Sequence, residues 1–270
     1  MTPAGTVVVT GAAGQIGAAV RPFLAQLFAS VRLVDVVPTT ANASNESVII
    51  GDVSDPVFAL RACMNADAVI HLAGPAPHSP WAAVQKANVT DVATLLGQAE
   101  RAGVRRIALA STMHVLGMYR REERITPGVP ARPSSLAAAA KLVGEHVGQW
   151  HAARTGARVV SVRIGCFKLT REESEPCAWI GPEDLARLFH HVLMHPRGNA
   201  PIVHAVAPHL GDDCGQRALW WRHGFRFRHR GESRGRSLQR LAGWYPADVI
   251  ARQYRGGEFA SKTLAPSLST

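Results

Sequence analysis

The stretch TVVVTGAAGQIG, residues 6–17, joins a short β-branched run to three closely spaced glycines. The run Thr6–Thr10 predicts a buried strand, and Gln15–Phe28 predicts a helix that begins directly after the glycines. A glycine-rich loop in this position lets backbone N–H groups and the amino terminus of the helix approach a pyrophosphate. The sequence therefore predicts a dinucleotide site, with contacts from Gly11, Gly14, Gln15, Ile16 and Gly17.

Acidic residues after the next two predicted strands fit the adenosine end of such a cofactor. Asp35 ends the second strand, where its carboxylate can accept hydrogen bonds from a ribose diol. Asp52 and Val53 follow the third strand, where the adenine edge would lie. A carboxylate at Asp35 repels a 2′-phosphate and therefore favours NADH. Nearby Arg32 leaves NADPH as an alternative cofactor. Five further residues are predicted to contact the cofactor: Leu72, Ala73, Gly74, Lys141 and Ile164.

Strand-like and helix-like segments alternate over the first 164 residues, which is typical of an α/β fold with a parallel sheet covered on both faces. We expect a doubly wound Rossmann sheet. The predicted strands are Thr6–Thr10, Val31–Val36, Ser47–Gly51, Ala68–Leu72, Arg106–Ala110 and Val159–Ile164. The predicted helices are Gln15–Phe28, Val57–Met64, Pro80–Arg101 and Ser134–Thr155.

The alternation stops after residue 164. A polar segment, Lys168–Glu175, is expected to act as a lid, and Trp179 after it can cover a substrate or anchor the next helix. A helix from Pro182 to about His195 and a short strand over Pro201–Val206 follow. We therefore expect a dinucleotide-binding domain over residues 1–164 and a substrate lobe and lid over residues 165–270, the two interleaved in one structural unit.

Composition narrows the class of protein. The chain has 270 residues, of which 47% are hydrophobic and 19% charged, as in a globular enzyme-sized domain. No apolar run is long enough for a membrane span, and a strand begins too early for a signal peptide, so we expect a cytoplasmic protein without membrane partners. The four cysteines have no metal-type spacing, which predicts neither a metal site nor disulfides.

The net charge of +10 raises the question of a nucleic-acid partner. Much of the excess lies in the segment 217–240, where WWRHGFRFRHR interleaves arginines with aromatic residues. Such a stripe can stack on single-stranded nucleic acid. We favour an amphipathic element that packs its aromatic residues inward, and expect no nucleic-acid partner.

Motifs along nearly the whole chain resemble one family. They are TGAAGQIG (10–17), GDV (51–53), HLAG (71–74), ANVT (87–90), ALAST (108–112) and WIGPEDLARLF (179–189). Together they resemble the extended short-chain dehydrogenase/reductase superfamily, the NAD-dependent epimerase/dehydratase type. The stretches STMHVLGMY, VPARP and VRIGCF are similar to its uronate dehydrogenase branch. The resemblance implies hydride transfer at a carbonyl or carbinol.

The same resemblance implies three catalytic groups, of which this sequence has two. The Ser/Thr position falls on Thr112, with Ser111 beside it, and the lysine that grips the nicotinamide ribose falls on Lys141. The tyrosine that gives or takes the proton would stand four residues before the lysine, where this chain has Ala137. No tyrosine in the chain is followed four residues later by a lysine.

Other side chains near this position are open to two interpretations. His114 can donate a hydrogen bond to a substrate or cap a turn. Asn88 matches a family position that orders water near the lysine, but it also fits an ordinary helix residue. Tyr119 can swing toward the site, although a packing role is favoured.

Loss of a general acid costs ~10² to 10⁴ in rate, which a reactive ketone can tolerate. We therefore expect an atypical NAD(P)H-dependent ketoreductase without a tyrosine acid, acting on a secondary-metabolite ketone such as an aromatic polyketide. In this it resembles atypical ketoreductases of antibiotic pathways. The alternative is a catalytically inactive dinucleotide-binding sensor or scaffold. The expected partner is a small ketone, and a homodimer is left open.

Overall fold

The fold is known from a computed structural model, which describes residues 4–75, 79–167, 179–195, 201–207, 224–228, 253–257 and 259–260. Seven parallel strands form one sheet in the order β3-β2-β1-β4-β5-β6-β9. They are β1 (Ala4–Thr10), β2 (Phe28–Asp35), β3 (Glu46–Ile50), β4 (Ala68–His71), β5 (Arg106–Thr112), β6 (Arg158–Ile164) and β9 (Ile202–Ala205). The predicted doubly wound α/β fold is confirmed.

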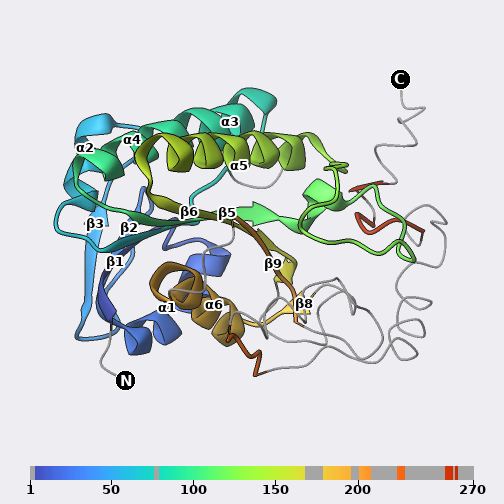
Figure 1. Cartoon of the computed structure of the whole chain (residues 1–270). Coiled ribbons are helices and arrows are strands. Elements are labelled where there is room, and N and C mark those ends of the chain that lie inside the picture. The colour runs from blue at the N-terminus through green and yellow to red at the C-terminus, as the bar shows by residue number, and fades with distance from the viewer. Residues whose placement is uncertain are drawn as a thin grey trace.

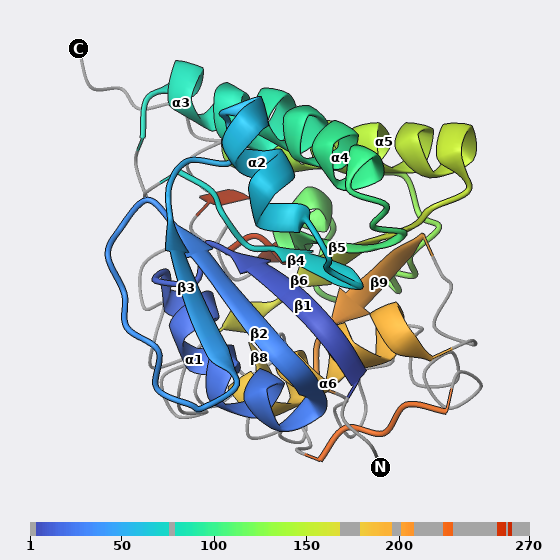
Figure 2. The ribbon, with the colours of Figure 1, turned by 90° about the vertical axis from the view of Figure 1, so that its left-hand side faces the viewer.

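Helices cover both faces of this sheet (Figures 1 and 2). On one face lie α2 (Pro56–Cys63), α3 (Trp81–Gln85), α4 (Asp91–Arg101) and α5 (Leu136–Thr155). On the other face lie α1 (Gln15–Leu27) and α6 (Pro182–Met194). Two short strands, β7 (Cys166–Phe167) and β8 (Trp179–Ile180), pair separately.

The apolar run of β1 explains why both faces are covered. Val7 and Val9 pack in the core cluster on the side of α1 and α6, whereas Val8 packs in the cluster on the side of α2 and α4. Successive side chains of a strand point to opposite faces, so a strand with three consecutive valines is buried on both sides.

One expectation needs correction. The segment 80–101 is not one helix: a π-helical turn, η1 (Lys86–Thr90), separates α3 from α4. The helix and the short strand expected after residue 164 are present as α6 and β9: α6 packs in the core against α1, and β9 pairs with β6. Residues before and after position 164 thus contribute strands to the same sheet.

Several expectations fall wholly or partly outside the described residues. The segment 168–175 is one of them, as are Cys177 and Cys214. Of the basic segment 217–240, the structure describes residues 224–228, where Phe225 is buried against His191 and Arg228 pairs with Glu183. Among the described residues there is no group of acidic, histidine or cysteine side chains able to hold a metal ion. None of the helices described is long and apolar enough to cross a membrane.

Candidate active site

A cleft of about 440 Å³ opens at the carboxyl ends of β1 to β4. The chain proceeds outward from β1 to β3 and then returns to β4 on the other side of β1, so the cleft lies at the point where the strand order reverses. Ligands of doubly wound sheets bind at such a switch point. Eight of the predicted cofactor residues line the cleft: Gly11, Gly14, Asp35, Asp52, Val53, Leu72, Ala73 and Gly74.

The loop Gly11–Gly14 has little room for side chains. Gly11 has a φ of 71°, and a Cβ there would lie 2.5 Å from the backbone nitrogen of Ala73. The first hydrogen bond of α1 runs from Ala18 N to Gly14 O. The amide groups of Gln15, Ile16 and Gly17 precede it, at the positive end of the helix dipole, where a pyrophosphate is stabilised. These three residues thus open α1 beside the cleft, although none of them is among the residues that line it.

Asp35 connects the glycine loop to the end of β2. Its Oδ2 accepts a hydrogen bond from Ala13 N at 2.9 Å, and its Oδ1 accepts one from Val37 N at 3.0 Å. Arg32, in contrast, donates to the carbonyl oxygens of Ala62 and Met64, at the end of α2. No lysine or arginine is among the described residues that line the cleft. The geometry therefore favours a ribose diol over a 2′-phosphate.

Asp52, which follows β3, lines the same cleft. Its Oδ1 accepts a hydrogen bond from Ser54 N at 2.8 Å, and this bond holds the pKa of the carboxyl below its usual value. The group is therefore ionised at neutral pH.

Lys141, in the second turn of α5, lies near one of the residues that line the cleft. A Cβ added to Gly74, which lines the cleft, would lie 3.9 Å from Lys141 Nζ. Burial lowers the pKa of this lysine to about 8. Ala137 lies four residues earlier and is exposed, and residues at this spacing share one face of a helix. Ser135 begins α5 by accepting a hydrogen bond from Ala138 N.

The two residues at the end of β5 point to opposite faces. Thr112 Oγ1 accepts a hydrogen bond from His114 N at 3.2 Å and caps the short helix η2 (Met113–Leu116). Ser111 is buried, and its Oγ donates to Glu145 Oε1 at 2.5 Å. Ser111 therefore binds a structural carboxylate rather than facing the cleft.

His114 and Tyr119 are held by neighbouring groups. His114 Nδ1 lies 3.2 Å from Ser134 Oγ, and its ring packs edge-on against Phe259. Tyr119 is buried, and its hydroxyl donates to Pro130 O at 2.9 Å. The packing interpretation of Tyr119 is thus supported. Ile164, at the end of β6, is a core residue.

A buried ion pair, which we did not predict, supports the active-site elements. Arg163 on β6 and Glu145 on α5 are 3% and 2% exposed, and their side chains approach to 2.7 Å. Together with Ser111 they join β5, β6 and α5. The sequence signal for this pair is an arginine within the mainly apolar strand VVSVRI, since a charge in a buried strand requires a partner.

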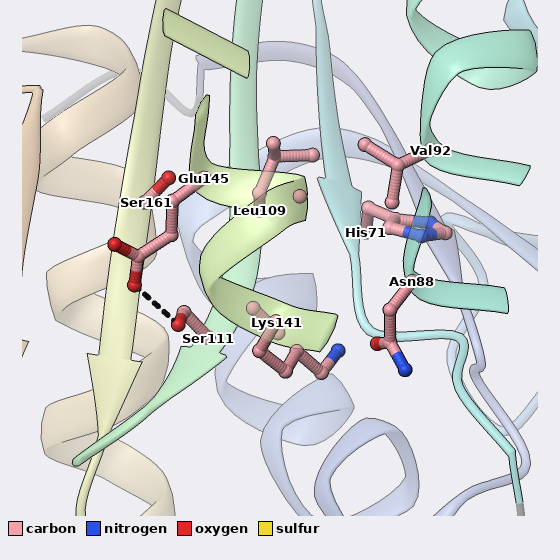
Figure 3. Close-up of a pocket in the computed structure, with 10 residues that line it drawn as sticks. His71, Asn88, Val92, Leu109, Ser111, Lys141, Glu145 and Ser161 are labelled. Carbon is pink, nitrogen blue, oxygen red and sulfur yellow. Dashed lines mark hydrogen bonds between the residues drawn. The ribbon is translucent and has the colours of Figure 1, made fainter. Parts of the chain in front are cut away.

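A small cavity of about 10 Å³ lies behind Lys141 (Figure 3). It is lined by His71, Asn88, Val92, Leu109, Ala110, Ser111, Lys141, Gly144, Glu145 and Ser161. His71 Nδ1 lies 2.7 Å from Thr10 Oγ1, and Asn88 Nδ2 donates to Val84 O at 2.8 Å. Lys141 lines this cavity, and its Nζ lies near Gly74, which lines the cofactor cleft.

Comparison with known proteins supports this interpretation of the cleft. A family model, the NAD dependent epimerase/dehydratase family, matches residues 7–167. The chain belongs to the NAD-dependent epimerase/dehydratase family. It is an oxidoreductase, and NAD is its cofactor, which the cleft described above fits.

Relatives in this family include a uronate dehydrogenase of Pseudomonas putida, which is 30% identical over 266 residues, covering 96% of this chain and 97% of the relative. The crystal structure of uronate dehydrogenase from Agrobacterium tumefaciens is similar with a TM-score of 0.82 and 25% identity, covering 95% of this chain and 97% of that one. A mutant of that enzyme, with one tyrosine replaced by alanine, is complexed with NAD and has a TM-score of 0.83 at 26% identity, with the same coverage.

Proposed function

We propose that this family member is an NADH-dependent ketoreductase that works without a tyrosine acid, and that it reduces a ketone of a secondary metabolite such as an aromatic polyketide. The observation that carries the proposal is the pairing of a well-formed NAD cleft with Ala137, one helical turn before Lys141, where the family pattern implies a tyrosine. A relative with a tyrosine-to-alanine change is also found with NAD, so such a change is compatible with cofactor binding.

The roles of the chain's own residues follow from their positions. Bound NADH supplies hydride. The loop Gly11–Gly17 and Asp35 hold the adenosine diphosphate half, and the Lys141 amine, beside Gly74, reaches the ribose on the nicotinamide side. Thr112, at the end of β5, orients the carbonyl, and Ser111 and His114 support its position through η2 and Glu145.

The substrate itself compensates for part of the rate that is lost with the missing general acid. A positioned general acid contributes ~10² to 10⁴ in rate, equivalent to about 3 to 5 kcal/mol of barrier. A ketone whose oxygen accepts a hydrogen bond from a neighbouring phenol is already polarised. We assign substrate binding to residues 165–270 and the reaction to the cytoplasm, in the setting of antibiotic biosynthesis.

The alternative is a catalytically inactive dinucleotide-binding sensor or scaffold, which the same alanine at position 137 would also permit. The two functions share every cofactor contact. They differ only in whether a ketone accepts hydride, so binding measurements alone do not separate them.

The test uses stereospecifically deuterated NADH with an ortho-hydroxyaryl ketone, its O-methyl ether as the matched control, and a uronate with NAD as the comparison reaction. We expect deuterium at the carbinol carbon of the hydroxyaryl product and at least tenfold slower transfer to the ether. Tight NADH binding without transfer to any ketone would favour the sensor. Uronate oxidation faster than ketone reduction would assign the chain the activity of its relatives.

A further inference from the structure

The connection between β2 and β3 crosses from one parallel strand to the next without a helix. Residues 36–45 have neither helical nor strand structure, and most of them are exposed. Connections between parallel strands usually contain a helix that packs on the sheet. Figure 2 shows this segment at the edge of the sheet, outside β3 and beside α1. Hydrophobic packing therefore contributes little to its position.

Two residues at the start of this segment line the cofactor cleft. Val36 and Val37 are 60% and 55% exposed, and Val37 N donates a hydrogen bond to Asp35 Oδ1. Apolar side chains in a ligand cleft are typical of surfaces that a ring of the ligand covers. The position of segment 36–45 thus affects the shape of the cleft at its adenosine end.

Arg21, in the middle of α1, holds this segment through its guanidinium. Its Nη1 donates to Thr39 Oγ1 at 3.2 Å, and its Nη2 donates to Thr40 O at 2.5 Å. Its Nε and Nη2 also donate to the two carboxylate oxygens of Glu46, the first residue of β3, at 3.1 Å and 2.5 Å. The side chain of Arg21 is 6% exposed and that of Glu46 is 1% exposed. One buried guanidinium therefore joins α1, the segment and β3.

Glu46 holds the same segment at a second place. Its Oε2 accepts hydrogen bonds from Asn42 N at 2.6 Å and from Ala43 N at 3.2 Å. Burial alone would raise the pKa of this carboxyl, but the hydrogen bonds from Arg21 and from these two amides lower it. The carboxylate is thus ionised at neutral pH, and charge-assisted hydrogen bonds fix residues 39–43.

Stability alone does not explain a buried ion pair at this place. The desolvation of two charges offsets much of their attraction, and well-packed apolar residues are often as stable. Apolar residues could not, however, bind the backbone of residues 39–43. The position on α1 is also informative, because the amino terminus of this helix lies where a pyrophosphate is stabilised and Arg21 follows almost two turns later.

We propose that the Arg21–Glu46 pair positions the binding surface for the adenosine half of NAD. The pair acts through segment 36–45, which it keeps ordered in the free protein, so that Asp35 and the two valines are in place before the cofactor binds. Without the pair, cofactor binding would have to order the segment, and each ordered residue costs conformational entropy. The role concerns the cofactor alone and is independent of the ketone reduction proposed above.

Two ligands that share a diphosphate separate the segment from the rest of the cleft. ADP and inorganic pyrophosphate can both occupy the amino terminus of α1, but only ADP carries the adenosine that reaches the segment. In Arg21→Met, we expect the affinity for ADP and for NADH to fall at least about tenfold, and that for pyrophosphate to change less than about twofold. Isothermal calorimetry measures all three. Arg154→Met, which breaks the exposed pair with Glu100, is the matched control and should bind ADP as wild type does.

A double variant separates positioning from stability. Arg21→Met leaves the Glu46 carboxylate buried without its partner, which destabilises the protein. Adding Glu46→Leu removes that charge, so the urea midpoint should return most of the way to the wild-type value. ADP affinity should nevertheless stay at least about tenfold below that of wild type, because the segment is still not held. Amide hydrogen exchange over residues 36–45 should be faster than in wild type in both variants, and saturating ADP should slow it.

The possible failures are distinguishable. Wild-type ADP affinity in the folded double variant would overturn the positioning role and leave the pair with a purely structural one. Equal losses of ADP and pyrophosphate affinity would place the damage at the amino terminus of α1 and would overturn it as well. Neither result bears on the ketone reduction, because these measurements use no ketone.

Discussion

The glycines of the cofactor loop differ in what a side chain would meet. At Gly11 and Gly17 a Cβ would come within 2.5 Å and 2.3 Å of backbone atoms, so substitution there would disturb the fold. At Gly14 the nearest atom is Gly11 O at 3.2 Å, a contact that a small shift relieves. Gly14 is therefore the position where cofactor binding can be tested without destroying the protein.

We predict that Gly14→Val weakens NADH binding at least a hundredfold, since its side chain would occupy the space of the pyrophosphate beside α1. Isothermal calorimetry measures the affinity, and thermal unfolding checks that the protein remains folded. Gly97→Ala, on α4 with nothing within 4 Å of its Cβ, is the control and should leave NADH affinity unchanged. Equal affinity in Gly14→Val and wild type would show that the cofactor does not follow this loop.

We propose that Asp35, which lines the cleft, sets the choice between the two cofactors. Asp35→Ala removes the diol acceptor and the repulsion of a 2′-phosphate, and it also frees Ala13 N. We predict that NADH affinity falls while the ratio of NADPH to NADH affinity rises at least tenfold. Titration of both cofactors against both proteins measures that ratio. If the ratio stays constant, Asp35 does not lie at the ribose.

At the level of elements, the sequence predicted the features that depend on local patterns. It missed the contacts between residues that are far apart in the chain. The glycine loop, Asp35 and the strand ends follow from spacing within one βαβ unit. The bond between His71 and Thr10 joins residues 61 positions apart, and that between Ser111 and Glu145 spans 34. Such pairs depend on the order of strands in the sheet, which spacing does not specify. The π-turn was also missed, because its residues have an ordinary helical pattern.

The Arg163–Glu145 pair gives a prediction at this scale. Arg163→Met leaves the Glu145 carboxylate buried without its partner, which costs about 3 to 5 kcal/mol of unfolding free energy. Urea unfolding measures the loss. The double variant Arg163→Met, Glu145→Leu should recover most of it, because no buried charge remains. Arg154→Met breaks the exposed pair with Glu100, which solvent screens, and should cost far less than Arg163→Met. Similar losses in the two single variants would contradict the structural role of the buried pair.

For the whole molecule, the buried histidines couple folding to pH. Burial lowers the pKa of His71 and of His204 to about 3, and neighbouring cations act in the same direction: Lys141 on His71, Arg163 and Arg255 on His204. His151 and His190 have pKa values lowered by burial as well. In the unfolded chain a histidine titrates near pH 6.5. Below that pH the unfolded state binds protons that the folded state excludes.

Stability should therefore fall as the pH decreases from 7 to 5. For a histidine that stays neutral when folded, linkage gives a loss of about 2 kcal/mol over this interval, so His71 and His204 together account for about 4 kcal/mol. Urea unfolding at the two pH values measures the difference. His204→Gln carries no titrating ring and should lose about half of the contribution of the two histidines, whatever its own stability at pH 7. Equal unfolding free energies at pH 7 and pH 5 in wild type would mean that these histidines take up protons in the folded protein, and that the surroundings of His71 are open to water.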